Sequence, residues 1–250
     1  MYYFLFDQVS SSKQRTDFEK IKDIAREYQI LSASAHISPA RNAEELLSDA
    51  IEKNFTTIVA VGDDTLINSV VTAIVRIREK KNIALGIICT NPESLLYERW
   101  GFPTFEEALE TLRYRKLERF TVGMIEPDHY FISSARIECK KPTRFMIEID
   151  RFKIEAIIDR LEISNNLYIL LERYGRERSI LKSTFNWLIG KESTYADRSV
   201  FKGKIIKIIS DGHASVKIGK KEVAKTPINV YKKLNALNII TKRDRISEVK

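Results

Sequence analysis

The chain has 250 residues, of which 44% are hydrophobic and 30% are charged, a composition typical of a folded globular protein. No apolar run approaches the roughly 18 residues that a membrane-spanning helix needs, and the start of the chain lacks the features of a secretion signal. We therefore expect a cytoplasmic protein. The two cysteines, Cys89 and Cys139, lie far apart and have no metal-ligand spacing, so both are expected to pack as small hydrophobic residues.

Charge is distributed unevenly along the chain. Residues 1–120 contain 16 Lys and Arg against 18 Asp and Glu, whereas residues 121–250 contain 26 against 16. A basic C-terminal half suits an anionic membrane surface, which would place the protein at the inner membrane surface, or nucleic acid through non-specific phosphate contacts. A solvated basic surface is the third interpretation. No nucleic-acid motif is present, so no specific nucleic acid is expected. The basic residues considered for headgroup contact are Lys220, Lys221, Lys225, Lys232 and Lys233.

The predicted elements of the first half alternate between strands and helices. Hydrophobic periodicity predicts strands at 2–6, 57–61 and 84–89, and helices at 16–28, 42–53, 67–80, 93–98 and 104–114. Strands that alternate with helices are typical of a parallel sheet with helices on both faces.

The second half is predicted to be rich in β-structure. Short strands are expected at 130–134, 143–149, 153–163, 167–171, 204–210, 214–218, 228–231 and 236–240, separated mostly by turn residues. The segment 173–199 receives no clear assignment. We expect two domains, an α/β domain at 1–122 and a mostly antiparallel β domain at 123–250. Whether the last strand packs back on the first domain is left open.

The segment 58–71, IVAVGDDTLINSVV, is the main candidate for a binding loop. A short β-branched strand ends at Gly62, Asp63 and Asp64 follow, and an apolar helix then begins. Backbone N–H groups at such a helix start can hold phosphate, and paired carboxylates can hold Mg²⁺ with the phosphates of a nucleotide. The alternative is that one aspartate caps the helix while the other is solvated.

Aligned without gaps, this segment resembles the Gly-Gly-Asp-Gly-Thr-Leu-Asn-Glu loop of the diacylglycerol kinase and lipid kinase family, and it retains Gly62, Asp64 and Asn68. The segment 85–103, LGIICTNPESLLYERWGFP, is similar to the family's second loop and its flanks, and the segments 201–210 and 216–230 resemble its closing strands. The resemblance therefore covers most of the chain, and it identifies the protein as a divergent member of this family.

The resemblance implies a site for ATP and Mg²⁺ between the two domains, and phosphoryl transfer to a lipid hydroxyl. It also implies the candidate residues. The nucleotide-binding candidates are Gly62, Asp63, Asp64, Asn68 and Ser10, and Asp64 is also the candidate metal ligand.

Several positions depart from the family pattern in ways that weaken this site. Asp63 replaces a loop glycine, and Pro92 and Glu93 stand within the second loop. The family's Asp-Gly-Glu turn, which supplies the catalytic base, falls on residues 219–221, Gly-Lys-Lys, so that Glu222 is the remaining candidate base. We therefore expect a lipid-kinase-like protein with impaired catalysis. The alternatives are a non-catalytic binding or scaffolding protein of the same fold and, more distantly, a basic nucleic-acid-binding protein.

Overall fold

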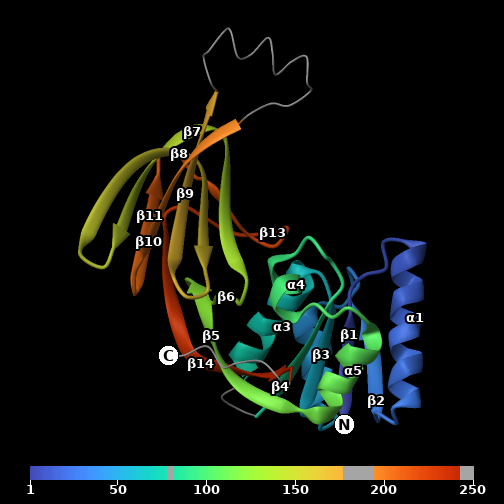
Figure 1. Ribbon diagram of the computed structural model, residues 1–250. Helices are drawn as coiled ribbons and strands as arrows, with labels where there is room; N and C mark the ends of the chain where they lie inside the picture. The colour runs from blue at the N-terminus through green and yellow to red at the C-terminus, as the bar shows by residue number, and fades with distance from the viewer. Residues whose placement is uncertain (78–81, 177–193, 243–250) are drawn as a thin grey trace, which may run out of the picture.

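The computed structural model of the protein describes residues 1–77, 82–176 and 194–242 (Figure 1). Its first half is a parallel sheet in the order β4-β3-β1-β2, with helices on both faces. The elements of this half are β1 (Tyr2–Phe6), α1 (Ser12–Glu27), β2 (Ser32–His36), α2 (Ala43–Glu52), β3 (Thr57–Gly62), α3 (Asp64–Ile77), β4 (Ala84–Cys89), α4 (Leu95–Trp100) and α5 (Phe105–Tyr114).

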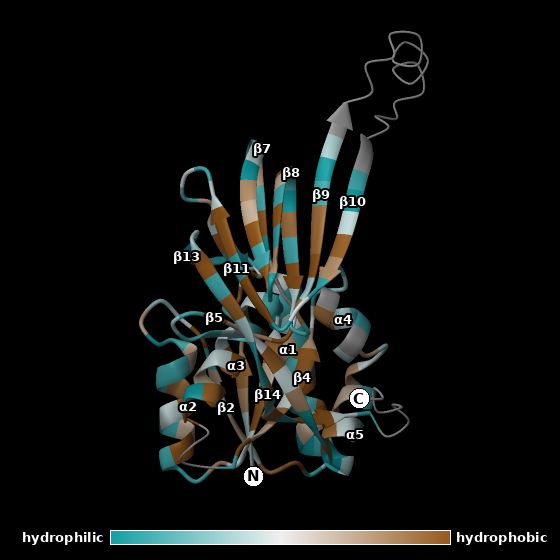
Figure 2. Ribbon diagram, turned by 90° about the vertical axis from the view of Figure 1, so that its left-hand side faces the viewer, coloured by the Kyte–Doolittle hydropathy of each residue, from teal (hydrophilic) through white to brown (hydrophobic). Residues whose placement is uncertain are grey.

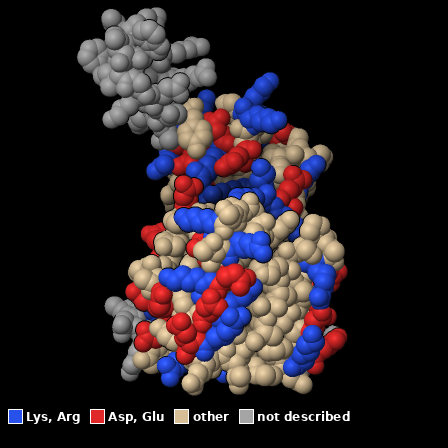
Figure 3. Space-filling view, turned by 90° about the vertical axis from the view of Figure 1, so that its right-hand side faces the viewer, with Lys and Arg blue, Asp and Glu red and all other residues tan. Residues whose placement is uncertain are grey.

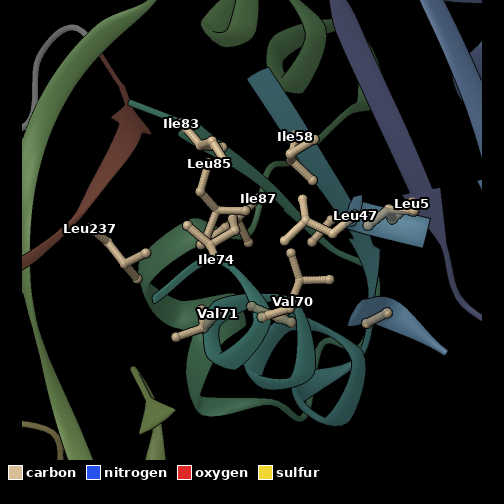
Figure 4. Close-up of a cluster of buried hydrophobic side chains, with 14 of the residues drawn as sticks. Leu5, Leu47, Ile58, Val70, Val71, Ile74, Ile83, Leu85, Ile87 and Leu237 are labelled. Atoms are coloured by element: carbon tan, nitrogen blue, oxygen red, sulfur yellow. The ribbon is translucent and has the colours of Figure 1, made fainter. Parts of the chain in front are cut away.

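The central strands are wholly buried because helices cover both faces of the sheet. Every residue of β3 and β4 is buried, which agrees with the continuous apolar runs of these two strands. Apolar residues of α1 and α5 pack on one face. Those of α2 and α3 pack on the other face, where Val70 and Ile74 of α3 lie against Ile58 and Leu85 (Figure 4).

The second half consists of antiparallel strands around a separate hydrophobic core. Hydrophobic and hydrophilic residues alternate along several of these strands (Figure 2), as expected where one face of a strand is buried. The strands are β5 (Lys116–Ile125), β6 (His129–Phe131), β7 (Ser134–Ile149), β8 (Phe152–Ser164), β9 (Tyr168–Arg176), β10 (Thr194–Lys202), β11 (Ile205–Ser210), β12 (Ser215–Ile218), β13 (Lys221–Lys225) and β14 (Ile228–Thr241). The predicted combination of an α/β part and an antiparallel β part is confirmed.

Two long strands join the two halves into one continuous sheet. The end of β14 lies parallel to β4, with Asn238 opposite Ala84, and it is antiparallel to β5 along its length. Residue 122, where we expect the domain boundary, falls within β5. No helix of the described residues is long and apolar enough to cross a membrane.

Three local differences from the predicted elements have physical explanations. Strand β2 escaped prediction because its sequence, SASAH, carries small residues instead of the β-branched residues that indicate strands. Helix α1 starts four residues earlier than expected because Ser11 caps it, accepting a hydrogen bond from the Gln14 N–H at 3.2 Å. The unassigned segment 173–199 contributes the end of β9 and the start of β10, while 177–193 lie outside the described residues.

Candidate functional site

Three aspartates meet at the carboxyl edge of the parallel sheet. Asp7 follows β1, and Asp63 and Asp64 follow β3, so parallel neighbours carry them to the same edge. The Asp7 N–H also donates to the carbonyl of Val61 at 3.0 Å. Burial raises the pKa of Asp7, and the nearby Asp63 charge raises it further. Sequence reasoning did not select Asp7, although its position directly after a buried strand is the signal that could have found it.

Asp63 caps helix α3. Its carboxylate accepts hydrogen bonds from the Thr65 N–H at 2.8 Å and from the Leu66 N–H at 3.3 Å. These are the backbone donors that a phosphate would need at this helix start. For Asp63 the structure therefore matches the interpretation in which one aspartate caps the helix.

Asp64 is half-buried and is held by a neighbouring loop. The Ser94 hydroxyl donates to its carboxylate, and the Cys89 thiol in turn contacts the Ser94 oxygen at 3.4 Å. Burial raises the pKa of Asp64, while the bond from Ser94 and the charge of Arg136 lower it. Asp64 is therefore not the solvated member that the capping alternative expected. Gly62 is needed for packing, because a side chain there would collide with Leu66 and with Asp7.

The turn between β12 and β13 lies directly on this loop. The Lys220 ammonium is 3.1 Å from an Asp63 carboxylate oxygen, and the Lys220 N–H donates to the Thr65 hydroxyl at 3.0 Å. Gly219 has φ +60, and a Cβ there would lie 2.7 Å from the Thr65 hydroxyl, so the close approach requires glycine. The hydrogen bond to Asp63 raises the pKa of Lys220. The β12–β13 turn thus brings a cation to the loop.

Asn68 connects the two halves of the molecule. Its side chain is 3% exposed, and its amide oxygen accepts from the Ile132 N–H at 2.9 Å. The amide nitrogen donates to the Asp64 carbonyl at 2.7 Å and to the Ser133 hydroxyl at 2.9 Å. All of these bonds are made within the protein, so Asn68 fixes α3 to the segment that follows β6.

Glu222 and Ser10 do not join the three aspartates at the edge of the sheet. The Glu222 carboxylate accepts from the Ser215 hydroxyl at 2.6 Å, and its neighbours Lys221 and Val223 line a pocket beside the loop. Because side chains alternate along a strand, Glu222 projects from the opposite face of β13. The Ser10 N–H and hydroxyl both bond the Gln14 side chain, at 2.8 and 2.9 Å, in an exposed position. Pro92 and Glu93 are also exposed.

A pocket of about 340 Å³ lies beside the loop, between α2, α3, β6 and the β12–β13 hairpin. Its lining includes the polar residues Asn42, Thr65, His129 and Lys221. Arg76 also lines it, but its guanidinium is held by Glu44 at 2.7 Å and by Asp128 at 2.9 Å. Burial lowers the pKa of His129.

The donors around the loop do not fit a bound triphosphate. Helix α3 offers phosphate no free first-turn N–H at Thr65 or Leu66, because Asp63 occupies both. Carboxylate oxygens are suitable ligands for Mg²⁺, yet Asp63 is engaged by Lys220 and Asp64 by Ser94. The described residues contain no group of three acidic, cysteine or histidine side chains that could hold a metal ion.

Comparison with known proteins identifies the family. Residues 1–125 match the model of the diacylglycerol kinase catalytic domain, whereas no curated protein matches the chain. A crystal structure described as a diacylglycerol kinase from Bacillus anthracis str. Sterne has a TM-score of 0.72 at 14% identity, with 98% of each chain covered. Another structure from this strain has a TM-score of 0.74 at 14% identity, with 97% of each chain covered. At this identity the structural likeness shows the fold, while the family model covers half of the chain. The chain therefore belongs to the diacylglycerol kinase catalytic-domain family.

Proposed function

We propose that this protein is a diacylglycerol-kinase-like member in which phosphoryl transfer is lost or very slow, and that it acts as a binding protein on the retained fold. The observation that carries the proposal is the contact of Asp63 with the start of α3 and with Lys220. The anion that neutralises this helix start is part of the chain itself.

Electrostatics supports this proposal. Two unit charges about 4 Å apart interact by about 4 kcal/mol at an effective dielectric constant of about 20. A phosphate at the start of α3 would meet the Asp63 carboxylate at about that distance, and it would lose the N–H donors that Asp63 already uses. Lys220 offsets part of this repulsion, but its ammonium is already paired with Asp63.

The chemistry of proton removal supports the same conclusion. A kinase that phosphorylates a hydroxyl needs a group that accepts its proton. Lys220 cannot serve, because the hydrogen bond to Asp63 raises its pKa and keeps it protonated. Glu222 is bonded to Ser215 on the other face of the hairpin.

The test is transfer of label from ATP to diacylglycerol in detergent micelles with Mg²⁺. We expect no product above the rate without protein. Rapid turnover that Asp64→Asn abolishes would refute the proposal, because it would show a working site built on the retained aspartate. The Glu52→Gln variant, at an exposed position at the end of α2 away from the loop, is the control for a general effect of losing one acid.

We also propose that an anionic membrane surface is the partner, and that contact is made by one tip of the β domain. Arg151 follows β7, Phe152 and Lys153 begin β8, Lys202 ends β10, and Lys204 lies between β10 and β11. The two turns are joined through Asp150, which accepts from the Lys204 N–H at 2.9 Å. We call these five residues the cationic tip.

The cationic tip combines exposed charge with an exposed ring. Phe152 is 75% exposed between two cations, and Lys202 lies over the ring of Tyr168, 4.7 Å from its centre. An aromatic ring that enters the headgroup region and cations that each contribute about 1 kcal/mol near an anionic surface favour membrane contact.

Vesicle flotation tests this partner. Native protein should float with vesicles that contain phosphatidylserine and remain below with phosphatidylcholine alone. Arg151→Glu with Lys204→Glu should abolish flotation. Lys13→Glu with Lys53→Glu makes the same charge change on exposed residues of the first half and should leave it intact. Equal losses in both variants would show that net charge, rather than the cationic tip, governs binding.

A further inference from the structure

The parallel sheet has one open edge, at strand β2. Among the described strands β2 pairs with β1 alone, so its other side has no neighbouring strand. Helix α1 leaves this side uncovered, because a groove of about 380 Å³ separates the two elements. Figure 3 looks onto this side of the molecule and shows a broad band without charged side chains beside a stripe of mixed charges.

The backbone groups that face outward follow from the ladder with β1. The Leu31 carbonyl accepts from the Tyr2 N–H at 3.0 Å, and the Ile37 N–H donates to the Phe6 carbonyl at 2.9 Å. A parallel ladder uses alternate residues of a strand, so residues 31, 33, 35 and 37 bond to β1. The N–H and carbonyl groups of Ser32, Ser34 and His36 therefore point away from the sheet, and no partner for them exists among the described residues.

We propose that β2 pairs antiparallel with β2 of a second copy of this chain, around a two-fold axis that passes through Ser34. In this register Ser34 lies opposite Ser34 of the copy and Ser32 lies opposite His36, so every outward N–H and carbonyl finds a partner. The strand lacks the lysine, proline or bulge with which exposed edges are usually protected against such pairing.

The side chains on the α2 face suit the same register. Ala33, Ala35 and Ile37 are partly buried against the core on that face, and Leu31 belongs to the same row. Leu31 is 76% exposed. The two-fold axis places Leu31 opposite Ile37 of the copy and Ala33 opposite Ala35, which forms one apolar row across the junction and buries Leu31.

The charges of α1 are also compatible with the proposed register. His36 lies against Phe18, with ring centres 5.8 Å apart, so these two residues lie at the same height along the direction of the strands. Ser34 precedes His36 by two residues, which is about 6.6 Å along β2. This distance corresponds to about four residues of a helix. The two-fold axis is therefore level with residues 22 and 23 of α1.

Around that axis the charges are complementary. Glu19 of one copy comes level with Arg26 of the other, and Lys22 comes level with Asp23. Within one copy these residues already form the pairs Lys22–Glu19 at 2.9 Å and Arg26–Asp23 at 2.6 Å. Two antiparallel α1 helices can thus exchange ion pairs without placing like charges opposite each other.

The first experiment is sedimentation of the full chain over a wide range of concentration. We expect a monomer–dimer equilibrium that Ser34→Pro weakens more than tenfold, because proline removes the outward N–H at the axis. The variant should keep its fold, since that N–H is not used in the monomer. Ser34→Ala keeps the N–H and should dimerise like the native chain. A native chain that stays monomeric, or a Ser34→Pro variant that dimerises normally, overturns the proposal.

The second experiment tests the register through α1. Glu19→Lys with Asp23→Lys makes this face wholly basic, and Lys22→Glu with Arg26→Glu makes it wholly acidic. Each variant alone should be weaker by more than tenfold, and their mixture should form a heterodimer. Dimers unaffected in both variants, or a mixture that stays monomeric, would refute the register. If the edge of β2 instead bound an extended peptide from another protein, the sedimenting mass would remain below that of a dimer.

Discussion

Replacement of Asn68 separates a structural role from a nucleotide-binding one. In the structure its amide makes three bonds, to the Ile132 N–H, the Ser133 hydroxyl and the Asp64 carbonyl. Asn68→Ala leaves the buried Ile132 N–H without a partner. The loss of a buried hydrogen-bond partner costs about 1–3 kcal/mol, and a net hydrogen bond contributes about 1 kcal/mol. We therefore expect the free energy of unfolding to fall by about 3 kcal/mol.

Urea denaturation measures this change, with the slope of the transition as a check that the unfolded state is unaltered. Ser69→Ala on the same helix is the matched control, because among the described residues the Ser69 hydroxyl bonds the Thr65 carbonyl of its own helix alone. The control should lose less than about 0.5 kcal/mol. A loss at Asn68 no larger than the loss at Ser69 would contradict the structural role assigned to Asn68.

Three further predictions follow from the geometry. Burial raises the folded-state pKa of Asp64 above its ordinary 3.8. The contribution of Asp64 to stability is therefore largest below pH 3.8 and is lost as the pH rises through the folded-state pKa. Urea curves should therefore show Asp64→Asn to be more stable than native protein at neutral pH, with the difference absent below pH 3.8. Gly219→Ala should cost about 2 kcal/mol, because it combines positive φ with a clash against Thr65, and amide exchange at Thr65 should become faster. Glu172 is 1% exposed and bonded to Arg160, so thermal unfolding of Glu172→Ala should show a loss of about 3 kcal/mol.

The parts of the fold that were predictable are those with a local signal. The apolar runs of β3 and β4 and the periodicity of α2 and α3 indicated a covered parallel sheet, and Figure 1 shows that arrangement. Strand β2 carries no such signal, since its Ser and Ala residues form a strand only because β1 offers a hydrogen-bonding edge. The position of β2 in the sheet follows from its tertiary contacts and not from a local sequence pattern.

The candidate site was predictable only in part. Asp63 and Asp64 are adjacent in sequence at the end of β3, so the local pattern was enough to select both. It did not select Asp7, which the parallel pairing of β1 with β3 brings to the same edge. The contact of Lys220 with Asp63 joins residues 157 positions apart, and no local pattern predicts it. The direction of Glu222 depends on the register of β12 with β13, which shifts between Val216 and Lys217. A shift of one residue exchanges the two faces of a strand, so sequence could not settle this point.

Calorimetric titration of the full chain with ATP and Mg²⁺ tests the central claim most directly. The claim is that Asp63, held by Lys220, occupies the helix start where the nucleotide's phosphates would bind. We predict no binding heat for the native protein, and measurable binding for Asp63→Gly, which frees the N–H groups of α3. Tight binding by the native chain, unchanged in Asp63→Gly, would contradict the account.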